Sequence, residues 1–134
     1  MVVPDTNVLI AYFSSKKNPI VYLLDKMLEK QNVLFSVVAV AEFLVKAKPV
    51  ESDFFLQIVD EIGIVPIDKE VMKQAILYRK STLQKTKKSH LLDCFIAATA
   101  KIHKATLLTL DRHDYPFSDI TVKQPEELMV SLKK

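Results

Sequence analysis

Segments of strand type and segments of helical periodicity alternate along almost the whole chain, and this alternation limits the possible folds more than any other feature. The expected strands lie at residues 1–4, 33–35, 64–66, 106–110 and, more weakly, 120–122. The expected helices lie at residues 8–13, 19–30, 37–48, 52–62, 69–83 and 92–102, with a last helix from Pro125. Strands separated by helices predict an α/β fold, in which a central parallel sheet of about four to five strands carries helices on both faces.

The length and composition fit one folded domain that spans residues 1–134. Globular domains cluster at roughly 100–150 residues, and this chain has 134 residues, of which 49% are hydrophobic and 26% are charged. This composition excludes the weakly hydrophobic class of disordered chains. The net charge of +3 is compatible with an anionic partner but does not require one.

The cysteine content and the hydropathy indicate the cellular compartment of the protein and whether it associates with membranes. Cys94 is the only cysteine, so an internal disulfide and a multi-cysteine zinc site are excluded, and a reducing compartment is favoured. No apolar run reaches the roughly 20 residues that cross a bilayer. The N-terminal segment lacks the basic residues of a signal peptide and contains Asp5 and Asn7. We therefore expect a cytoplasmic protein that does not associate with membranes.

Four acidic residues interrupt apolar segments near the ends of expected strands or inside expected helices: Asp5, Glu42, Asp93 and Asp111. Burying a carboxylate among apolar groups is costly unless a cation or strong hydrogen-bond donors compensate it. In doubly wound sheets, ligands bind outside the carboxyl ends of the strands, where Asp5 and Asp111 are expected. Carboxylate oxygens are ligands for hard cations such as Mg²⁺ and Mn²⁺, so these residues predict a metal site.

Each of these acids also has a purely structural interpretation. Asp5 could cap a helix through its side chain, and Glu42 could form an ion pair with Lys46, one turn later in the same helix. Asp93 could complement the dipole of its helix, and Asp111 could be a turn residue. Independent structural roles at all four positions are much less expected than one shared site.

The order and context of short motifs around these acids match a known pattern. Residues 5–7 (Asp-Thr-Asn) close the first expected strand, and residues 41–42 (Ala-Glu) lie in a helix. Asp93 precedes the small-residue helical run at residues 96–100, and residues 109–111 (Thr-Leu-Asp) close a late strand. Together these motifs resemble those of PIN-domain ribonucleases, specifically the VapC toxins of VapBC toxin–antitoxin pairs, over almost the whole chain.

Two residues depart from this pattern. Glycine often precedes the late strand in PIN domains, whereas Lys104 stands beside Ala105 here, and Pro4 is unusual inside the first strand. Neither departure changes an acidic residue, so the expected site is unaffected.

The resemblance implies a PIN-domain endoribonuclease that hydrolyses RNA phosphodiester bonds with one or two Mg²⁺ or Mn²⁺ ions. The catalytic and metal-binding residues would be Asp5, Glu42, Asp93 and Asp111, with Asp114 as a possible further ligand. Residues that orient the carboxylates through hydrogen bonds would be Thr6, Asn7 and Thr109. Such toxins usually form homodimers and are silenced by a separate antitoxin protein, so we expect both kinds of partner.

A basic run precedes Asp93 and includes Lys85, Lys87 and Lys88. A solvated loop would account for such a run by itself. Beside a metal site, however, it could bind the phosphate backbone of RNA, and Arg112 could extend that surface. These four residues therefore form a candidate RNA-binding surface.

Other protein classes fit the chain less well. A receiver domain expects adjacent acids after its first strand, whereas Thr6 follows Asp5 here. A haloacid-dehalogenase-type phosphotransferase expects a second acid two residues after the first, where Asn7 stands. The main alternative is a catalytically silent PIN-type RNA-binding scaffold or RNA-processing factor.

Overall fold

The computed structural model describes residues 1–14, 19–83 and 90–132, in which helices and short strands alternate. The helices are α1 (Thr6–Ser14), α2 (Pro19–Glu29), α3 (Val37–Lys46), α4 (Pro49–Ile62), α5 (Lys69–Thr82), α6 (Leu91–Ile102) and α7 (Pro125–Leu132), with a short 3₁₀ helix η1 at Arg112–Asp114. The strands are β1 (Val2–Pro4), β2 (Phe35–Ser36), β3 (Ile64–Val65), β4 (Thr106–Leu108) and β5 (Val122–Lys123). The predicted α/β class is confirmed, but the central sheet has three strands where about four to five were predicted, because β2 and β3 form a separate two-stranded sheet.

The strands form two parallel pieces, a three-stranded sheet in the order β1-β4-β5 and a two-stranded sheet of β2 and β3. The pieces meet where Val2 forms a parallel bridge with Val33. There the Val2 amide donates to the Asn32 carbonyl at 2.9 Å, and the Leu34 amide donates to the Val2 carbonyl at 2.8 Å. The spatial order is therefore β3-β2-β1-β4-β5, and the winding reverses between β1 and β4, where doubly wound folds bind ligands.

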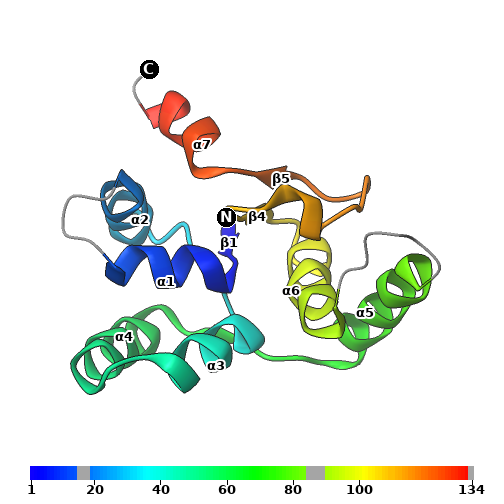
Figure 1. The fold of residues 1–134 in the computed structure, drawn as a ribbon, viewed down its shortest axis with the longest axis horizontal. Helices are drawn as coiled ribbons and strands as arrows, with labels where there is room; N and C mark the ends of the chain where they lie inside the picture. Colours follow the sequence, from blue (N-terminus) through cyan, green and yellow to red (C-terminus); the bar gives the residue numbers. More distant parts are fainter. Residues whose placement is uncertain (15–18, 84–89, 133–134) are drawn as a thin grey trace.

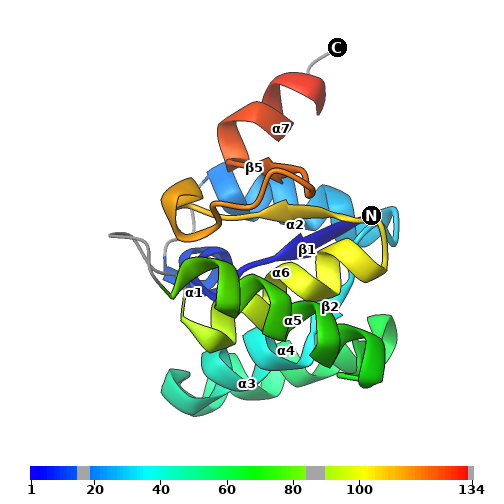
Figure 2. The same ribbon diagram turned by 90° about the vertical axis from the view of Figure 1, so that its right-hand side faces the viewer.

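Helices cover both faces of this sheet, as the sequence predicts. Figure 1 shows α1 and α2 on one side of β1 and β4, and α6 with α5 on the other side. Helix α6 contacts β1 and β4 directly and packs against α5. Figures 1 and 2 both place α7 at the opposite end of the molecule from α3 and α4. The edge formed by the ends of β1 and β4 thus lies between two helical layers.

The centre of the core lies between α6 and the sheet. Val3 of β1 and Leu107 of β4 are adjacent in register and fully buried. On α6 the buried side chains are mostly small and include Ala97 and Ala98, which lets the helix approach the strands closely. Cys94 is also fully buried, and burial raises the pKa of its thiol to about 11, so it is a packing residue rather than a nucleophile.

A second part of the core is aromatic. Phe55 of α4 is buried, and its ring lies 4.9 Å from that of Phe43, 5.3 Å from that of Phe35 and 5.9 Å from that of Phe13, centroid to centroid. These edge-to-face contacts join α1, α3 and α4 to β2. The helices of the described segments include none that is both long and apolar enough to span a membrane.

Several boundaries differ from the predicted ones for local reasons. Helix α4 begins at Pro49 rather than residue 52, because proline suits a first helical position and the Glu51 carboxylate accepts a 3.1 Å hydrogen bond from the Lys48 amide. Strand β2 lies at Phe35–Ser36, and the expected pairing at Val33 is reduced to the isolated bridge. Lys104 has φ 54°, a left-handed conformation that favours glycine.

Candidate active site

Asp5 lies at the switch point, directly after β1, and its side chain is only 5% exposed. Its amide donates to the carbonyl of Leu108 at 2.8 Å, which fixes its backbone beside the end of β4. Its carboxylate accepts hydrogen bonds from the Thr6 amide at 2.7 Å and from the Thr109 hydroxyl at 2.9 Å. The backbone carbonyl of Asp5 accepts from the amides of Val8 and Leu9 and so begins the hydrogen bonding of α1. The carboxylate accepts from only one amide of the first turn, that of Thr6, and its other oxygen is bound to Thr109, so helix capping accounts for only part of its contacts.

The environment of Asp5 acts on its pKa in opposing directions. Burial has the largest effect and raises the pKa above its ordinary value of 3.8. Hydrogen bonds from Thr109 and Thr6 and the interaction with the Tyr115 hydroxyl lower it, whereas the charge of Asp114 raises it. The net shift is upward, so the described donors do not fully compensate the buried charge.

Asp93 lies in the first turn of α6, as predicted, and is partly buried. Its pKa is raised to about 6, first by burial and then by the charges of Asp5 and Asp114, with a smaller contribution from Glu42. A backbone hydrogen bond at His90 opposes part of this rise. Asp93 therefore experiences the charges of three other acids. We call these four residues, Asp5, Glu42, Asp93 and Asp114, the acidic cluster.

Glu42 joins this cluster from α3. The Thr6 hydroxyl donates to Oε1 of Glu42 at 2.8 Å and so connects α1 to α3. Within the described residues, Glu42 forms no ion pair with Lys46. The alternative of a simple surface pair one helical turn apart is thus not what positions this carboxylate.

Two of the predicted orienting residues form a connected set with the loop after β4. The side-chain nitrogen Nδ2 of Asn7 donates to the Thr109 hydroxyl at 3.3 Å, and the side-chain oxygen Oδ1 of Asn7 accepts from the Leu110 backbone amide at 3.2 Å. The Thr109 hydroxyl also accepts from the Asp111 amide at 3.1 Å. These bonds tie the loop that carries Asp111 to the Asp5 carboxylate.

Asp111 and Asp114 occupy different environments. Asp111 is exposed, and its carboxylate caps η1 by accepting from the His113 amide at 3.0 Å. Asp114 is partly buried, and its charge raises the pKa of both Asp5 and Asp93. Its own pKa is raised by burial and by Asp111, against the lowering effect of His90 and His113. Of the two, Asp114 is thus more closely coupled to the acidic cluster.

Tyr115 is a site residue that the sequence analysis missed. It is 3% exposed, and the charges of Asp5, Asp93 and Asp114, together with burial, raise the pKa of its hydroxyl. The hydroxyl interacts favourably with ionised Asp5, but in the described residues it makes no hydrogen bond of ordinary geometry. The available signal was a hydroxyl-bearing aromatic residue directly after Asp114.

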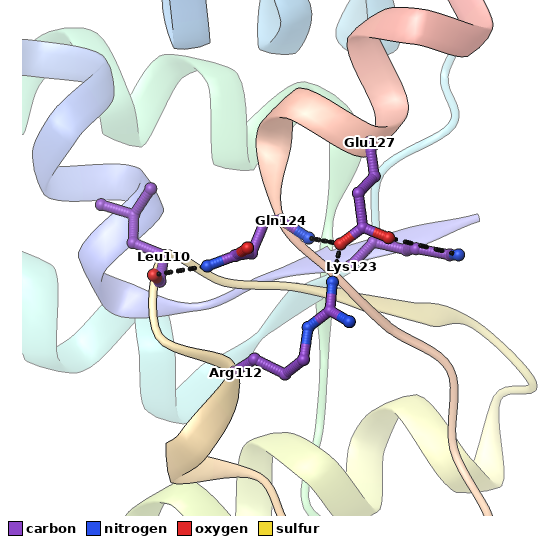
Figure 3. A network of polar contacts seen from close by, with 5 residues as sticks. All are labelled: Leu110, Arg112, Lys123, Gln124 and Glu127. Atoms are coloured by element: carbon purple, nitrogen blue, oxygen red, sulfur yellow. Dashed lines mark hydrogen bonds and ion pairs between the residues drawn. The ribbon is translucent and has the colours of Figure 1, made fainter.

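The predicted RNA-binding residues are only partly placed. Lys85, Lys87 and Lys88 lie outside the described residues. Arg112 forms an ion pair with Glu127 of α7, which also lies 3.5 Å from Lys123. Figure 3 shows Glu127 between these two cations. Arg112 is therefore engaged within the chain.

The same network joins the loop after β4 to the start of α7. Oε1 of Glu127 accepts from the Gln124 amide at 3.1 Å, and the Gln124 side chain donates to the Leu110 carbonyl at 3.2 Å (Figure 3). The loop is consequently held on one side by Asn7 and on the other by the segment that leads into α7.

The donor set of the cluster suits a hard divalent cation. Its charged groups are carboxylates, and burial and mutual repulsion leave Asp5, Asp93 and Asp114 with raised pKa values. Within the described residues, no group of three or more acidic, histidine or cysteine side chains is arranged so that it could hold a metal ion. Mg²⁺ does not need such a group, because it is usually held by one or two carboxylates and retains several waters. The residues thus fit an open cation site.

Comparisons with known proteins bear on the family and the fold of the chain. A family model described as the PIN domain matches residues 2–122. No curated protein sequence matches the chain. Among solved structures, FitAB bound to an IR36 DNA fragment is similar at 28% identity and a TM-score of 0.76, over 93% of this chain and 95% of that chain.

Two further structures extend the similarity. FitAcB from Neisseria gonorrhoeae shares 25% identity with a TM-score of 0.73, over 94% of this chain and 99% of that chain. A toxin–antitoxin complex from Klebsiella pneumoniae has 24% identity and a TM-score of 0.67, over 93% of this chain and 98% of that chain. At 24% identity, the similarity to the Klebsiella pneumoniae complex shows a shared fold only.

Proposed function

The chain belongs to the PIN-domain family, and from this premise we propose that it is a metal-dependent endoribonuclease that hydrolyses RNA phosphodiester bonds. The observation that carries the proposal is the coupling of Asp5, Asp93 and Asp114 at the switch point of the sheet, where each carboxyl pKa is raised. Burial and like charges of this kind are typical of functional sites.

In this proposal some of the acids bind the cation and others orient the attacking water. Asp5 is the central ligand, because its orientation is fixed by Thr6 and Thr109. Asp93 and Asp114 complete the cation site, with Asp111 as a further candidate ligand. Glu42, held by the Thr6 hydroxyl, binds a cation or orients the attacking water. Thr6, Asn7 and Thr109 act by fixing carboxylates and the loop after β4.

The cofactor in this proposal is one or two Mg²⁺ or Mn²⁺ ions. Such ions would activate water and neutralise charge on the phosphate and the leaving oxygen. The carboxylates must be ionised to bind them. Since the pKa of Asp93 is raised to about 6, we expect cation binding to strengthen as the pH rises through this region.

We further propose that the protein is the toxin of a type II toxin–antitoxin pair, with a separate antitoxin protein as partner and a homodimer as its own assembly. Membership of the PIN family and the similarity to FitAB and FitAcB support this proposal. Expression of the wild-type chain alone should arrest growth of a bacterial host, whereas Asp93→Asn should not. Sedimentation that shows only a monomer at micromolar concentrations would contradict the dimer.

Cleavage of a labelled structured RNA by purified protein tests the enzymatic proposal. Wild-type protein and the exposed-acid control Asp53→Asn should cleave with Mg²⁺ or Mn²⁺ and not with EDTA. Asp93→Asn, purified identically, should lose cleavage, because an amide cannot replace an ionised ligand. Equal cleavage by wild type and Asp93→Asn would indicate a contaminating nuclease. A single-stranded DNA of the same sequence tests whether RNA is the preferred substrate.

The alternative is a catalytically silent RNA-binding scaffold. It would bind the RNA without cleaving it in any metal, and Asp93→Asn would bind as well as wild type. The raised pKa values of Asp5 and Asp93 favour the enzyme, because a scaffold has no use for buried carboxylates that destabilise its metal-free fold.

A further inference from the structure

The hydroxyl of Tyr115 has no hydrogen-bond partner of ordinary geometry in the described part of the chain, although the residue is only 3% exposed. Two other tyrosines behave differently. The Tyr12 hydroxyl donates to Asp25, and the Tyr78 hydroxyl donates to Asp119 at 2.9 Å. A buried hydroxyl that lacks a partner is destabilising, so a phenylalanine would serve better at position 115 if packing were its only role.

The surroundings of this hydroxyl are acidic. Asp5, Asp93 and Asp114 all interact with it electrostatically, and their charges and its burial raise its pKa. The phenol therefore keeps its proton at neutral pH and remains a hydrogen-bond donor. Its backbone is held in place, because the Tyr115 amide donates to the Arg112 carbonyl at 3.1 Å.

Asp5 has room for this donor. An ionised carboxylate offers about four acceptor positions. Thr6 occupies one on Oδ1 and Thr109 one on Oδ2. The remaining positions allow one cation contact and one further hydrogen bond.

We propose that Tyr115 is a positioning residue whose hydroxyl donates a hydrogen bond to the Asp5 carboxylate when a divalent cation occupies the acidic site. This inference rests on the proposed cation site but adds a residue to it. In the metal-free protein the hydroxyl already interacts with Asp5 and lowers the pKa of that carboxyl, but the contact does not have ordinary hydrogen-bond geometry. With a cation, repulsion among the acids is relieved, and Asp5 is held by three donors, Thr6, Thr109 and Tyr115.

Tyr115→Phe tests the proposal, because it keeps the ring and removes only the unpartnered hydroxyl. Tyr78→Phe is the matched control, since it makes the same chemical change where the hydroxyl is already bonded to Asp119. The measurements are the melting temperature in EDTA and the affinity for Mn²⁺ alone, followed by paramagnetic resonance of the free ion.

In EDTA, Tyr115→Phe should lose less melting temperature than Tyr78→Phe, because only the Tyr78 hydroxyl makes a hydrogen bond of ordinary geometry. With Mn²⁺, Tyr115→Phe should bind about 10-fold more weakly than wild type or worse, as is typical when an orienting partner of a metal ligand is removed. Tyr78→Phe should bind like wild type. In RNA cleavage, Tyr115→Phe should then lower kcat and leave KM unchanged.

Mn²⁺ affinity of Tyr115→Phe within about twofold of wild type would overturn the inference, whatever happens to its melting temperature. If wild-type protein itself fails to bind Mn²⁺, the proposed cation site fails and the inference fails with it. Intact binding by wild type and by Tyr115→Phe alike would reject only the role of Tyr115. The two failures are therefore distinguishable.

Discussion

The Thr109 hydroxyl donates a 2.9 Å hydrogen bond to Oδ2 of Asp5, although the two residues lie 104 positions apart in the sequence. The contact follows from the register of the sheet, in which Pro4 at the end of β1 lies opposite Leu108 at the end of β4. Asp5 and Thr109, which form the bond, are the residues that directly follow these two strands. Parallel pairing thus delivers a carboxylate and its orienting hydroxyl to the same edge.

Thr109→Val should destabilise the protein by about 1–3 kcal/mol, because Thr109 is fully buried and the change leaves polar partners without their bond. Asp5 loses a donor, and Asn7 and the Asp111 amide lose an acceptor. Thr109→Ser keeps the hydroxyl and should destabilise the protein less than Thr109→Val. Denaturant unfolding in EDTA measures both variants, and equal stability of Thr109→Val and wild type would contradict the role of this bond.

The metal-free protein should become less stable as the pH rises from about 4 to about 6, as far as Asp93 determines its stability. Its pKa is raised from 3.8 to about 6 on folding, so in this range the unfolded chain releases the proton while the folded chain retains it. The folded state therefore loses stability as the pH rises. The loss is complete above the folded pKa.

Asp93→Asn removes this titration. In EDTA, the melting temperature of Asp93→Asn minus that of wild type should increase between about pH 4 and pH 6 and then remain constant. Near pH 7 the variant should be the more stable protein, although it is inactive. A difference that does not vary with pH would show that the fold does not raise the pKa of Asp93.

Asp114→Asn should weaken Mn²⁺ binding more than Asp111→Asn. Asp114 acts electrostatically on Asp5 and Asp93, whereas Asp111 is exposed and caps η1. Asparagine also caps helices well, so Asp111→Asn should preserve the local fold. Isothermal titration of both variants with Mn²⁺ measures their affinities. A larger loss of affinity in Asp111→Asn than in Asp114→Asn would make Asp111 the principal ligand of this loop.

Lys104→Gly should stabilise the protein by up to about 1 kcal/mol. Lys104 has φ 54°, where a side chain is disfavoured by roughly 1–2 kcal/mol, and the entropy of glycine offsets only part of that gain. Lys73→Gly is the control, because it places the same substitution at an exposed position inside α5, where it should destabilise by about 1 kcal/mol. Thermal melts in which both substitutions lower the melting temperature by the same amount would contradict the conformational argument.

The sequence predicted the elements that depend on local pattern. The alternation of strands and helices, the parallel sheet with helices on both faces, and Asp93 in the first turn of α6 all follow from periodicity and motif order. The site residues at strand ends were also predictable. Asp5 and Thr109 close β1 and β4, so parallel pairing of these strands suffices to bring them together.

The features that were not predicted depend on contacts between distant segments. Tyr115 becomes a site residue only because the turn after η1 places its hydroxyl near Asp5. The hydrogen bond from Thr6 to Glu42 depends on how α1 packs beside α3. The ion pair of Arg112 with Glu127 depends on the path into α7. Periodicity describes single segments and carries no information on such pairs.

On the proposed function, the acids at the ends of β1 and β4 and at the start of α6 bind a divalent cation. Titration of Mn²⁺ into wild-type protein, Asp5→Asn and the exposed-acid control Asp60→Asn near pH 7, followed by paramagnetic resonance, tests this claim most directly. We expect wild type and Asp60→Asn to bind one or two ions and Asp5→Asn, still folded, to lose this binding. Equal binding by all three proteins, or none by wild type, would contradict the claim.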